Sequence, residues 1–416
     1  MASPMSLDSR ARQAAFGRSR TMSRSRVSSD VAQILTHSID ALQRWVEERD
    51  YKGYDPGDGL TSWARSFTFG NLFAERLLQQ LVWKSPFNLR PLLGIRPLES
   101  TKGRGFMAWG YLLRARQTGS QDAKAKGIAC LDWLKDNPAP VRRGLAWGNH
   151  FDFSTRGGRM PAHQPTLVWS SLIGQAFLEA YEQELNVRYL DSARQICDWI
   201  LSLPRDAGCL SYVGYEQASI HNSNMLGAAM LARTWKHAAD PAYLEAARGA
   251  VEYSCSRQRT DGSWFYGEET RYHWIDSFHT GYNLDSLKRY VDNTGDETFR
   301  DNLLRGYAYF KDRFFDDNGR PHYYHDKTYP IDIQCAAQAI DTFSLFSDED
   351  ESALDQAVNV ALWTIRNMQG DGGFFHYRQY PLLKAKTAYF HWGQATMFKA
   401  LSHLLWRLSP AGAKSD

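Results

Sequence analysis

Apolar residues recur at helical spacing along most of the chain, and the pattern is interrupted at regular intervals. Between residues 243 and 290, a stretch with Leu244, Ala247 and Val251 on one face leads into a turn at 258–267 that is rich in glycine and aromatic residues. A second apolar stretch then runs to about residue 290. Spacings of three and four residues place side chains on one face of a helix. This segment is therefore predicted to be a helical hairpin with an aromatic turn.

The same order of helix, aromatic turn and helix occurs six times. The turn residues Tyr212, Phe265, Tyr323 and Phe374 lie 53, 58 and 51 residues apart, a length that fits two helices of about four turns and their connections. The second helix of each copy is the more apolar one, so we expect it to lie inside a ring, with short strand segments only in the turns. The six copies are predicted at 31–82, 123–181, 189–235, 243–290, 298–345 and 353–406.

The first copy is predicted to place its inner helix at 62–82, and residues 84–120 then lie outside the repeat. Pro86 and Pro91 interrupt any helix there, and 106–113 are expected to form a short one. No function is assigned to this segment.

The composition narrows the class of protein. Hydrophobic types make up 43% of the 416 residues, which is too high for a disordered chain, and no run of ~18 apolar residues predicts a membrane-spanning helix. Such a length often means two or three domains, but six hairpins of one kind predict a single domain at 31–408. Residues 1–30 and 409–416 are predicted to be disordered.

Charge is distributed unevenly. The net charge is +3, and residues 1–30 hold six arginines against two aspartates, so the rest of the chain is close to neutral. No nucleic-acid groove is predicted, and the basic tail is expected to make at most weak contact with an anionic surface. The tail lacks the apolar region of a secretory signal, which favours a cytoplasmic location. The oligomeric state stays open.

Recurring motifs of metal or cofactor sites are not found in the sequence. Its five cysteines are scattered without a C-x-x-C pair, so neither a disulfide framework nor a zinc ribbon is expected. There is no H-E-x-x-H, phosphate-binding loop or G-x-S-x-G motif. We therefore expect no metal and no cofactor.

The connections that enter the inner helices should converge on one mouth, and they are rich in aromatic, acidic and imidazole side chains. An aspartate there is as easily a helix N-cap, and a tryptophan in a turn is more often a packing residue. Three arginines among them match the fork geometry that binds a uronate carboxylate. The candidate substrate-binding residues are Tyr54, Asp55, Trp147, Arg156, His221, Asn222, Trp264, Arg271, Tyr324, Tyr329, Asp332, Arg378, His391 and Trp392.

Two acidic residues are the leading candidates for acid–base chemistry. Asp276 and His279 are three residues apart on an apolar inner helix, where such groups are costly unless they are paired or used. Asp152 lies between two phenylalanines, a setting expected to raise its pKa as a general acid requires. Glu216 is the alternate carboxylate. His279, His150 and Tyr266 are expected to orient groups or share protons.

The six-hairpin pattern resembles the (α/α)6 toroid of carbohydrate-active enzymes. These include unsaturated glucuronyl hydrolases and related glycosidases, polysaccharide lyases, sugar 2-epimerases and the helical part of glucuronyl C5-epimerases. Several strings look closest to an uncharacterised bacterial group associated with surface-polysaccharide gene clusters: 53–60, 147–153, 261–267, 276–282 and 323–333. The string 258–264 also resembles the Q-x-x-D-G-S-W repeat of squalene–hopene cyclases, but their D-x-D-D signature is missing.

This resemblance implies a fold more firmly than a reaction. The leading hypothesis is a glycoside hydrolase-like enzyme that acts on a bacterial oligo- or polysaccharide, or on its lipid-linked precursor, with two carboxylates as acid and base. The alternatives are a uronate C5-epimerase or lyase, in which Tyr and His exchange protons, and a non-catalytic glycan-binding or scaffold protein. A terpene cyclase would need a dry cavity nearly free of acids, which the polar connections argue against.

Overall fold

The computed structural model describes residues 29–155, 158–410 and 412, and these residues form six helical hairpins. The prediction of an all-α fold is confirmed. The outer helices are α2 (Ser29–Glu47), α5 (Gln121–Asp136), α7 (Val187–Leu201), α9 (Pro241–Cys255), α11 (Arg300–Arg313) and α13 (Ala353–Met368). The inner helices are α4 (Thr101–Thr118), α6 (Leu167–Glu184), α8 (His221–Ala238), α10 (Ser277–Thr294), α12 (Ile333–Leu345) and α14 (Thr396–Leu408). A π-helical turn at Phe390–Ala395 leads into α14.

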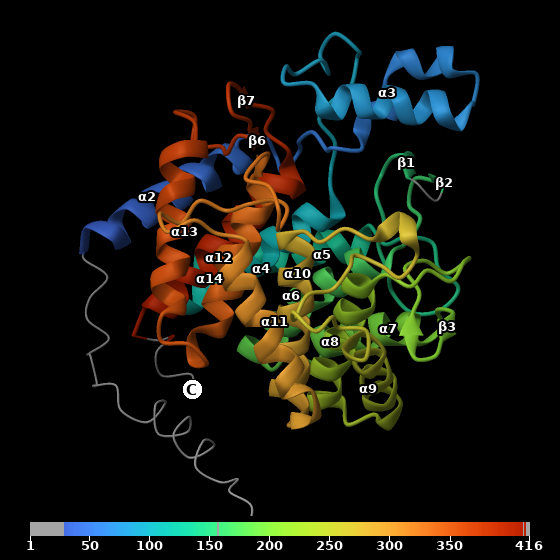
Figure 1. Ribbon diagram of the computed structural model, residues 1–416, viewed down its shortest axis with the longest axis vertical. Coiled ribbons are helices and arrows are strands. Elements are labelled where there is room, and N and C mark those ends of the chain that lie inside the picture. Colours follow the sequence, from blue (N-terminus) through green and yellow to red (C-terminus); the bar gives the residue numbers. More distant parts are fainter. Residues whose placement is uncertain (1–28, 156–157, 411, 413–416) are drawn as a thin grey trace, which may run out of the picture.

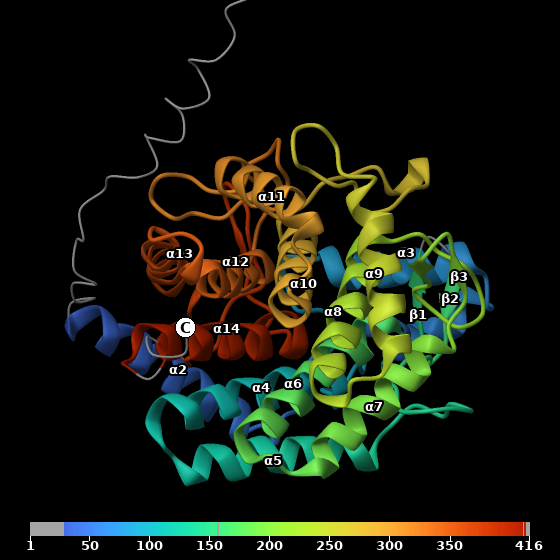
Figure 2. The same ribbon diagram turned by 90° about the horizontal axis from the view of Figure 1, so that it is seen from below.

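The inner helices close into a ring, with the outer helices around them (Figures 1 and 2). Each inner helix packs against the next, and α14 packs against α4. This confirms the (α/α)6 toroid. The prediction for residues 1–30 falls almost entirely on residues outside the described part. No described helix combines the length and apolarity that crossing a bilayer requires.

The first hairpin differs from its prediction. Its inner helix is α4 at 101–118, and residues 52–100 form an arm inserted between α2 and α4, which contains α3 (Leu72–Lys84) and projects beyond the ring (Figure 1). The predicted inner helix at 62–82 and the predicted extra segment at 84–120 are therefore wrong. Several apolar side chains of α3, including Phe73 and Leu77, face solvent, whereas α4 is buried although it carries Lys102 and Arg104.

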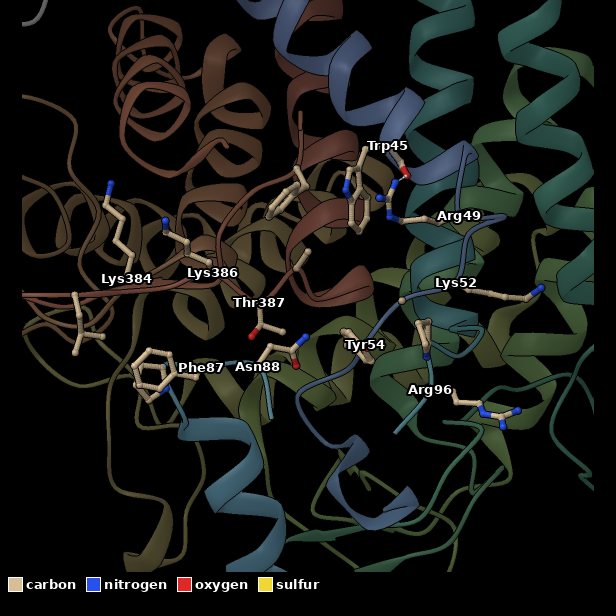
Figure 3. Close-up of a pocket in the computed structure, with 16 residues that line it drawn as sticks. Trp45, Arg49, Lys52, Tyr54, Phe87, Asn88, Arg96, Lys384, Lys386 and Thr387 are labelled. Carbon is tan, nitrogen blue, oxygen red and sulfur yellow. Dashed lines mark hydrogen bonds between the residues drawn. The ribbon is translucent and has the colours of Figure 1, made fainter. Parts of the chain in front are cut away.

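A cleft of 950 Å³ separates the arm from the ring (Figure 3). It is lined by Tyr54, Phe87 and Arg96 of the arm, by the end of α2, and by a hairpin at 378–390. Tyr54 is held there below the buried Arg90 guanidinium, 5.5 Å from the ring centre.

The short strands lie in the connections that enter inner helices, as predicted. β1 (Phe153–Thr155) pairs with β2 (Gly158–Met160) ahead of α6, and β3 (Arg205–Asp206) pairs with β4 (Cys209–Leu210) ahead of α8. β6 (Arg378–Gln379) lies between β5 (Ile331–Asp332) and β7 (Lys384–Ala385), and it pairs Arg378 with Asp332. These pairings fix the loops that surround the mouth of the ring.

A repeated glycine explains the spacing of the hairpins. Gly262 has a φ of +90°, and an added Cβ there would lie 2.4 Å from the Arg305 carbonyl oxygen on α11. The turn therefore needs glycine both for its backbone conformation and for its close approach to the next outer helix. Glycines at the other turns approach the following outer helix in the same way, and Gly373 closes the circle on Ala41 of α2: Gly144, Gly208, Gly319 and Gly373.

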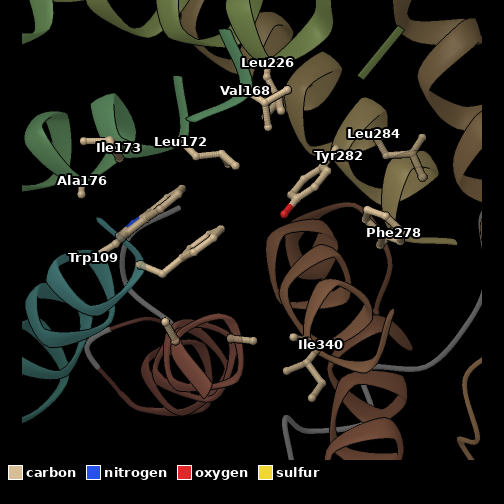
Figure 4. Packing of buried hydrophobic residues seen from close by; sticks show 14 of the residues in the cluster. Trp109, Val168, Leu172, Ile173, Ala176, Leu226, Phe278, Tyr282, Leu284 and Ile340 are labelled. Atoms are coloured by element: carbon tan, nitrogen blue, oxygen red, sulfur yellow. The ribbon is translucent and has the colours of Figure 1, made fainter. Parts of the chain in front are cut away.

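The core lies between the inner and outer helices and across the middle of the ring. Residues of α4, α6, α8, α10 and α12 meet there, among them Trp109, Leu172 and Ile340 (Figure 4). These apolar side chains form a floor across the middle of the ring and separate its two open ends. The N-termini of the inner helices lie at one end, the mouth, and their C-termini at the other, the far end.

Candidate active site

The mouth of the ring holds a cavity of 610 Å³. Residues from the first turns of four inner helices line it, and α3 of the arm covers one side with Arg76 and Trp83. The connections ahead of the inner helices supply the remaining wall. The lining residues used below are Lys102, Trp169, Glu216, Asn222, Tyr266, Trp274, Phe278, His279, Tyr282, Tyr323, Tyr324, Arg378 and Trp392.

Asp276 and His279 form a hydrogen-bonded pair at the start of α10. Asp276 caps the helix by accepting the His279 backbone N–H at 3.0 Å, and its second oxygen lies 2.7 Å from His279 Nδ1. That oxygen also accepts the Trp274 indole N–H at 2.9 Å. Because a carboxylate only accepts, Nδ1 is the donor and Nε2 is left with a lone pair. The His279 side chain remains 19% exposed, toward the cavity.

Aromatic rings fix the orientation of His279. The ring of Tyr266 lies 4.5 Å from His279 and stacks on Trp274 at 4.5 Å, and Phe278 packs at 3.8 Å on the histidine. Burial raises the pKa of Tyr266 well above its usual value, so its hydroxyl keeps its proton near neutral pH.

A second charged pair lies beside the first. Asp332 caps α12 through the Gln334 N–H at 2.9 Å, accepts Arg378 Nε at 2.5 Å and accepts the Trp392 indole N–H at 3.1 Å. Burial raises the pKa of Asp332 despite the opposing effect of Arg378. The carboxylate is therefore already committed to three donors and holds Arg378 and Trp392 in the cavity wall.

Lys102 is the cation at the floor of the cavity. Its ammonium lies 4.8 Å from the ring centre of Trp169 and 6.0 Å from that of Tyr282, which projects from the opposite helix α10. Burial lowers the pKa of Lys102 to about 8. Among the described residues, no carboxylate forms an ion pair with this ammonium and no acceptor hydrogen-bonds it. It is thus a desolvated cation that faces the cavity.

The structure brings part of the predicted set to this cavity. Those that line it are His279, Glu216, Tyr266, Asn222, Tyr324, Arg378 and Trp392. Asp276 and Asp332 lie directly behind the wall. Asp55 contacts His391 Nδ1, and the His391 ring lies 5.8 Å from Trp169, so this pair lies next to the floor. Their catalytic and binding roles remain predictions.

Asp152 does not have the predicted environment. Arg65 NH2 bonds its carboxylate at 2.7 Å and the Ala162 N–H bonds it at 2.8 Å. These donors lower the pKa of Asp152 even though burial alone would raise it. The expected raised pKa is wrong, because two flanking phenylalanines in the sequence do not show which polar groups face the carboxylate.

Other predicted residues are used within the scaffold. Trp147 and Trp264 are buried and donate their indole N–H groups to the Leu134 and Ser254 carbonyls, so both rings pack within the scaffold. His221 bonds Ser254 at 3.0 Å and Glu268 at 2.7 Å between α8 and α9.

The remaining predicted residues lie away from the cavity wall or outside the described residues. His150 lies 3.2 Å from the Glu99 carbonyl, and Arg271 pairs with Glu269 on the surface. Tyr329 precedes a cis proline, and Tyr54 belongs to the arm cleft. Arg156 falls outside the described residues.

The sequence interpretation missed several wall residues. Lys102 was missed because the first inner helix was predicted in the wrong place. Had a helix been predicted to start at residue 101, Lys102 would have stood out as a polar residue at the start of an inner helix, as Asp276 did. Trp274 and Tyr282 flank the segment 276–279 and would have followed from it. Arg76, Trp83, Trp169 and Tyr323 have no signal in the sequence that separates them from core residues.

No group of three or more His, Cys, Asp or Glu side chains suited to a metal ion occurs within the described residues. The described wall offers the His279 imidazole, the ammonium groups of Lys102 and Lys84, guanidinium groups, tyrosine hydroxyls and the Glu216 carboxylate, together with indole rings.

Comparison with known proteins gives a match in structure alone. No protein-family model and no curated protein sequence matches the chain. A heparin-specific unsaturated glucuronyl hydrolase superposes with a TM-score of 0.59 at 12% identity, over 90% of this chain and 96% of that one. A cellobiose 2-epimerase from Bacillus thermoamylovorans gives 0.60 at 9%, over 75% and 90%. A polysaccharide lyase gives 0.57 at 10%, over 91% and 98%. The chain therefore shares the six-hairpin toroid of these carbohydrate-active enzymes.

Proposed function

We propose that the protein is a carbohydrate-active enzyme that removes the proton from carbon 5 of a uronic acid residue, as uronate C5-epimerases and polysaccharide lyases do. One observation carries the proposal. The Asp276–His279 pair presents an imidazole nitrogen to a cavity lined by Lys102, Arg76 and Lys84, for which no ion-pair partner occurs within the described residues, and by one carboxylate at its exposed edge, Glu216. A base beside cations is the arrangement that abstraction of a proton next to a carboxylate requires.

The charge of the wall favours an acidic sugar. Arg76, Lys84 and Lys102 line the cavity, and no ion-pair partner for them occurs within the described residues. Glu216 is the one acidic side chain among the lining residues, and it is exposed. A uronate carboxylate held by such cations acquires a more acidic neighbouring C–H, because the negative charge that develops on the carboxylate is stabilised.

The proton path follows from the hydrogen bonds. His279 Nε2 takes the C5 proton, and Asp276 stabilises the imidazolium through Nδ1. The electron pair of the broken C–H bond moves into the carboxylate. In an epimerase, an acid on the opposite side of the sugar returns a proton to C5, whereas Tyr266 packs against His279 and orients it. In a lyase, the pair returns to expel the C4 oxygen, which takes the proton instead.

Hydrolysis by two carboxylates fits the described wall less well. Asp276 and Asp332 each accept three hydrogen bonds from the protein, which leaves little capacity for a glycosidic oxygen or an attacking water. Glu216 is then the one carboxylate among the lining residues, where hydrolysis needs two. Glycosidases need one carboxylic acid and one free carboxylate on either side of the bond. The structure of the wall therefore favours the second hypothesis from the sequence over the first.

The aromatic side chains supply the sugar-binding surface. Trp169, Trp274 and Trp392 present indole rings to the cavity, and such rings stack on the apolar face of a pyranose. Two of the structural neighbours are named for a glucuronyl substrate and for polysaccharide cleavage, which supports the same substrate class. The identity of the sugar and an origin in a bacterial surface polysaccharide remain predictions.

The test is incubation with uronate oligosaccharides in D2O. We expect either deuterium at C5, detected by mass spectrometry, or an unsaturated product that carries no hydrogen at C5, and we expect the loss of either signal in His279→Gln. Deuterium without cleavage identifies an epimerase, and an unsaturated product that absorbs near 230 nm identifies a lyase. New reducing ends with neither signal would show hydrolysis and refute the proposal, and unchanged sugar that still binds would show a glycan-binding protein.

A further inference from the structure

The arm presents a concentrated apolar surface to solvent. The described residues expose sixteen large apolar side chains, and eleven of them belong to the arm or to the hairpin at 378–390 beside it. Phe69 is 91% exposed, Phe73 77% and Leu382 97%. These eleven, which we call the arm patch, are Trp63, Phe67, Phe69, Leu72, Phe73, Leu77, Leu81, Phe87, Leu92, Leu382 and Leu383. Single exposed apolar residues are ordinary, but a gathering of this size marks an interaction site.

The arm patch contains a residue with an unfavourable backbone conformation. Phe69 has a φ of +49°, a left-handed conformation that is unfavourable for a bulky residue, and its ring is almost fully in solvent. Along α3, Phe73, Leu77 and Leu81 follow one another at four-residue spacing on the outer face. Glu75, Gln79 and Val82 form the opposite, buried face of the same helix. Helix α3 is thus amphipathic with an apolar face directed away from the ring.

Cations without acids surround the arm patch. Residues 76–98 contain four basic residues and no acidic one, and residues 378–390 contain three and none. Arg90 and Arg378 among them are turned inward and paired with Asp58 and Asp332, which leaves five cations near the arm patch. Glu75, just ahead, is buried and held by Arg65 and Arg159. Lys84, Arg96 and Lys386 are exposed, and among the described residues none of them has an ion-pair partner. Arg96, Lys384 and Lys386 surround the arm cleft next to Phe87 (Figure 3).

We propose that the arm patch docks this protein on the surface of an anionic lipid bilayer. Aromatic and leucine side chains on an amphipathic helix enter the boundary between headgroups and acyl chains, and flanking lysines and arginines bind anionic headgroups. A second copy of the chain fits less well, because a two-fold contact would bring two sets of unpaired cations and no acid into one interface. This docking does not depend on the chemistry proposed above.

Docking in this way places the cavity beside the bilayer. The inner side of α3 carries Arg76 and Trp83, which line the cavity, while its outer side carries the arm patch. A bilayer bound to the outer side therefore lies within one helix diameter, about 10 Å, of the cavity wall.

A probe attached to the arm distinguishes this docking from binding through the arginine-rich segment at 1–30. All five cysteines are buried, so a cysteine introduced on the surface can be labelled selectively. The full chain carries an environment-sensitive fluorophore at Phe69→Cys or Leu77→Cys, and at Val187→Cys on α7 as the matched exposed control. Vesicles of phosphatidylcholine alone are compared with vesicles that contain phosphatidylglycerol.

We expect a blue shift, and quenching by nitroxide-labelled acyl chains, at 69 and 77 with the anionic vesicles but not at 187. Phe69→Ser combined with Phe73→Ser should lower co-sedimentation with those vesicles at least tenfold, whereas Leu185→Ser should not. Three results would overturn the proposal: vesicle binding with no change at 69 and 77, no vesicle binding at all, or a blue shift that depends on protein concentration without lipid.

Discussion

The two ends of the ring use charged residues in opposite ways. At the far end, Arg233 bonds both Glu179 and Glu182, and Lys399 and His403 both bind Asp341. At the mouth, Arg378 is paired with Asp332, but Lys102 and Arg76 line the cavity and neither forms an ion pair with another described residue. The far-end pairs join α6 with α8 and α12 with α14, whereas Lys102 belongs to α4 and Arg76 to α3 of the arm. Paired charges cross-link helices, whereas an unpaired buried charge costs stability and is retained where it is used.

The pKa values follow the same division. At the far end, burial would raise the pKa values of Glu182 and Asp341, but their basic partners lower both well below the usual range. At the mouth, burial lowers the pKa of Lys102 to about 8, against a smaller opposing effect of Asp55. Burial also lowers the pKa values of Lys399 and His403 at the far end, so pairing there stabilises the acids, whereas Lys102 at the mouth lacks an ion-pair partner among the described residues. Four changes test this division, from the largest expected effect to the smallest.

Asp276→Asn should have the largest effect on activity. Asparagine still caps α10 but cannot stabilise the His279 imidazolium, so we expect a loss of about 10²- to 10⁴-fold in kcat/KM. The measurement is the rate of deuterium uptake at C5, or of formation of the unsaturated product, with a uronate oligosaccharide. The melting temperature should stay within a few degrees of the parent. Full activity in this variant would remove His279 as the base.

Arg233→Met should have the largest effect on stability. It leaves the buried Glu179 and the half-buried Glu182 with only Arg116 and His237 as basic partners, and we expect a loss of about 3 kcal/mol in the free energy of unfolding. Urea unfolding measures this loss. The folded fraction should keep its kcat/KM, since the residue lies at the far end. If kcat/KM per folded molecule fell as far as in Asp276→Asn, the separation of a stabilising far end from a catalytic mouth would be contradicted.

Lys102→Met should stabilise the fold and impair the site. The folded-state pKa of about 8 lies below the ordinary value of 10.5, so the protonated lysine destabilises the fold at pH 7 by roughly 3 kcal/mol. This penalty is complete below pH 8 and disappears as the pH rises toward 10.5. Urea unfolding at pH 7 and at pH 10 should show a gain that shrinks at the higher pH. A lower stability at pH 7 would mean that the cation is compensated after all.

The smallest expected effect is a shift in the pH dependence of kcat/KM in Lys102→Arg. If the Lys102 cation holds the substrate carboxylate, kcat/KM should fall above pH 8 by up to tenfold per pH unit. Lys102→Arg keeps its charge, so the same decline should move to higher pH whatever its absolute rate. An identical alkaline limb in both proteins would assign it to another group.

The ring could be predicted from the sequence because each hairpin repeats the same pattern of outer helix, glycine-containing turn and apolar inner helix. Helical spacing, apolar second helices and glycine turns all give local signals, and Asp276 with His279 was conspicuous as a polar pair on an apolar helix. The first hairpin was predicted incorrectly for the same reason. Phe73, Leu77 and Leu81 look like a core face, but the structure exposes them, while the helix that carries Lys102 and Arg104 is buried.

The composition of the mouth was harder to predict than its location. Trp147, Trp264 and Trp274 all lie in connections that lead into inner helices. The indole N–H groups of Trp147 and Trp264 donate to backbone carbonyls in the scaffold, whereas Trp274 lines the cavity. Asp152 and Asp332 could each be a cap, an acid or a partner of arginine. The direction in which a side chain points depends on contacts far apart in the sequence, such as Arg65 with Asp152, and these are set only when the ring closes.

Binding of an acidic disaccharide tests the central claim most directly, because it needs no assumption about the reaction. Calorimetric titration with a uronate disaccharide compares the parent with Lys102→Met at the mouth and with Lys236→Met, an exposed lysine that lines the far-end cavity. We predict at least tenfold weaker binding for Lys102→Met and a Kd within twofold of the parent for Lys236→Met. Unchanged binding in Lys102→Met, or weakening confined to Lys236→Met, would contradict the assignment of the mouth as the site for an acidic sugar.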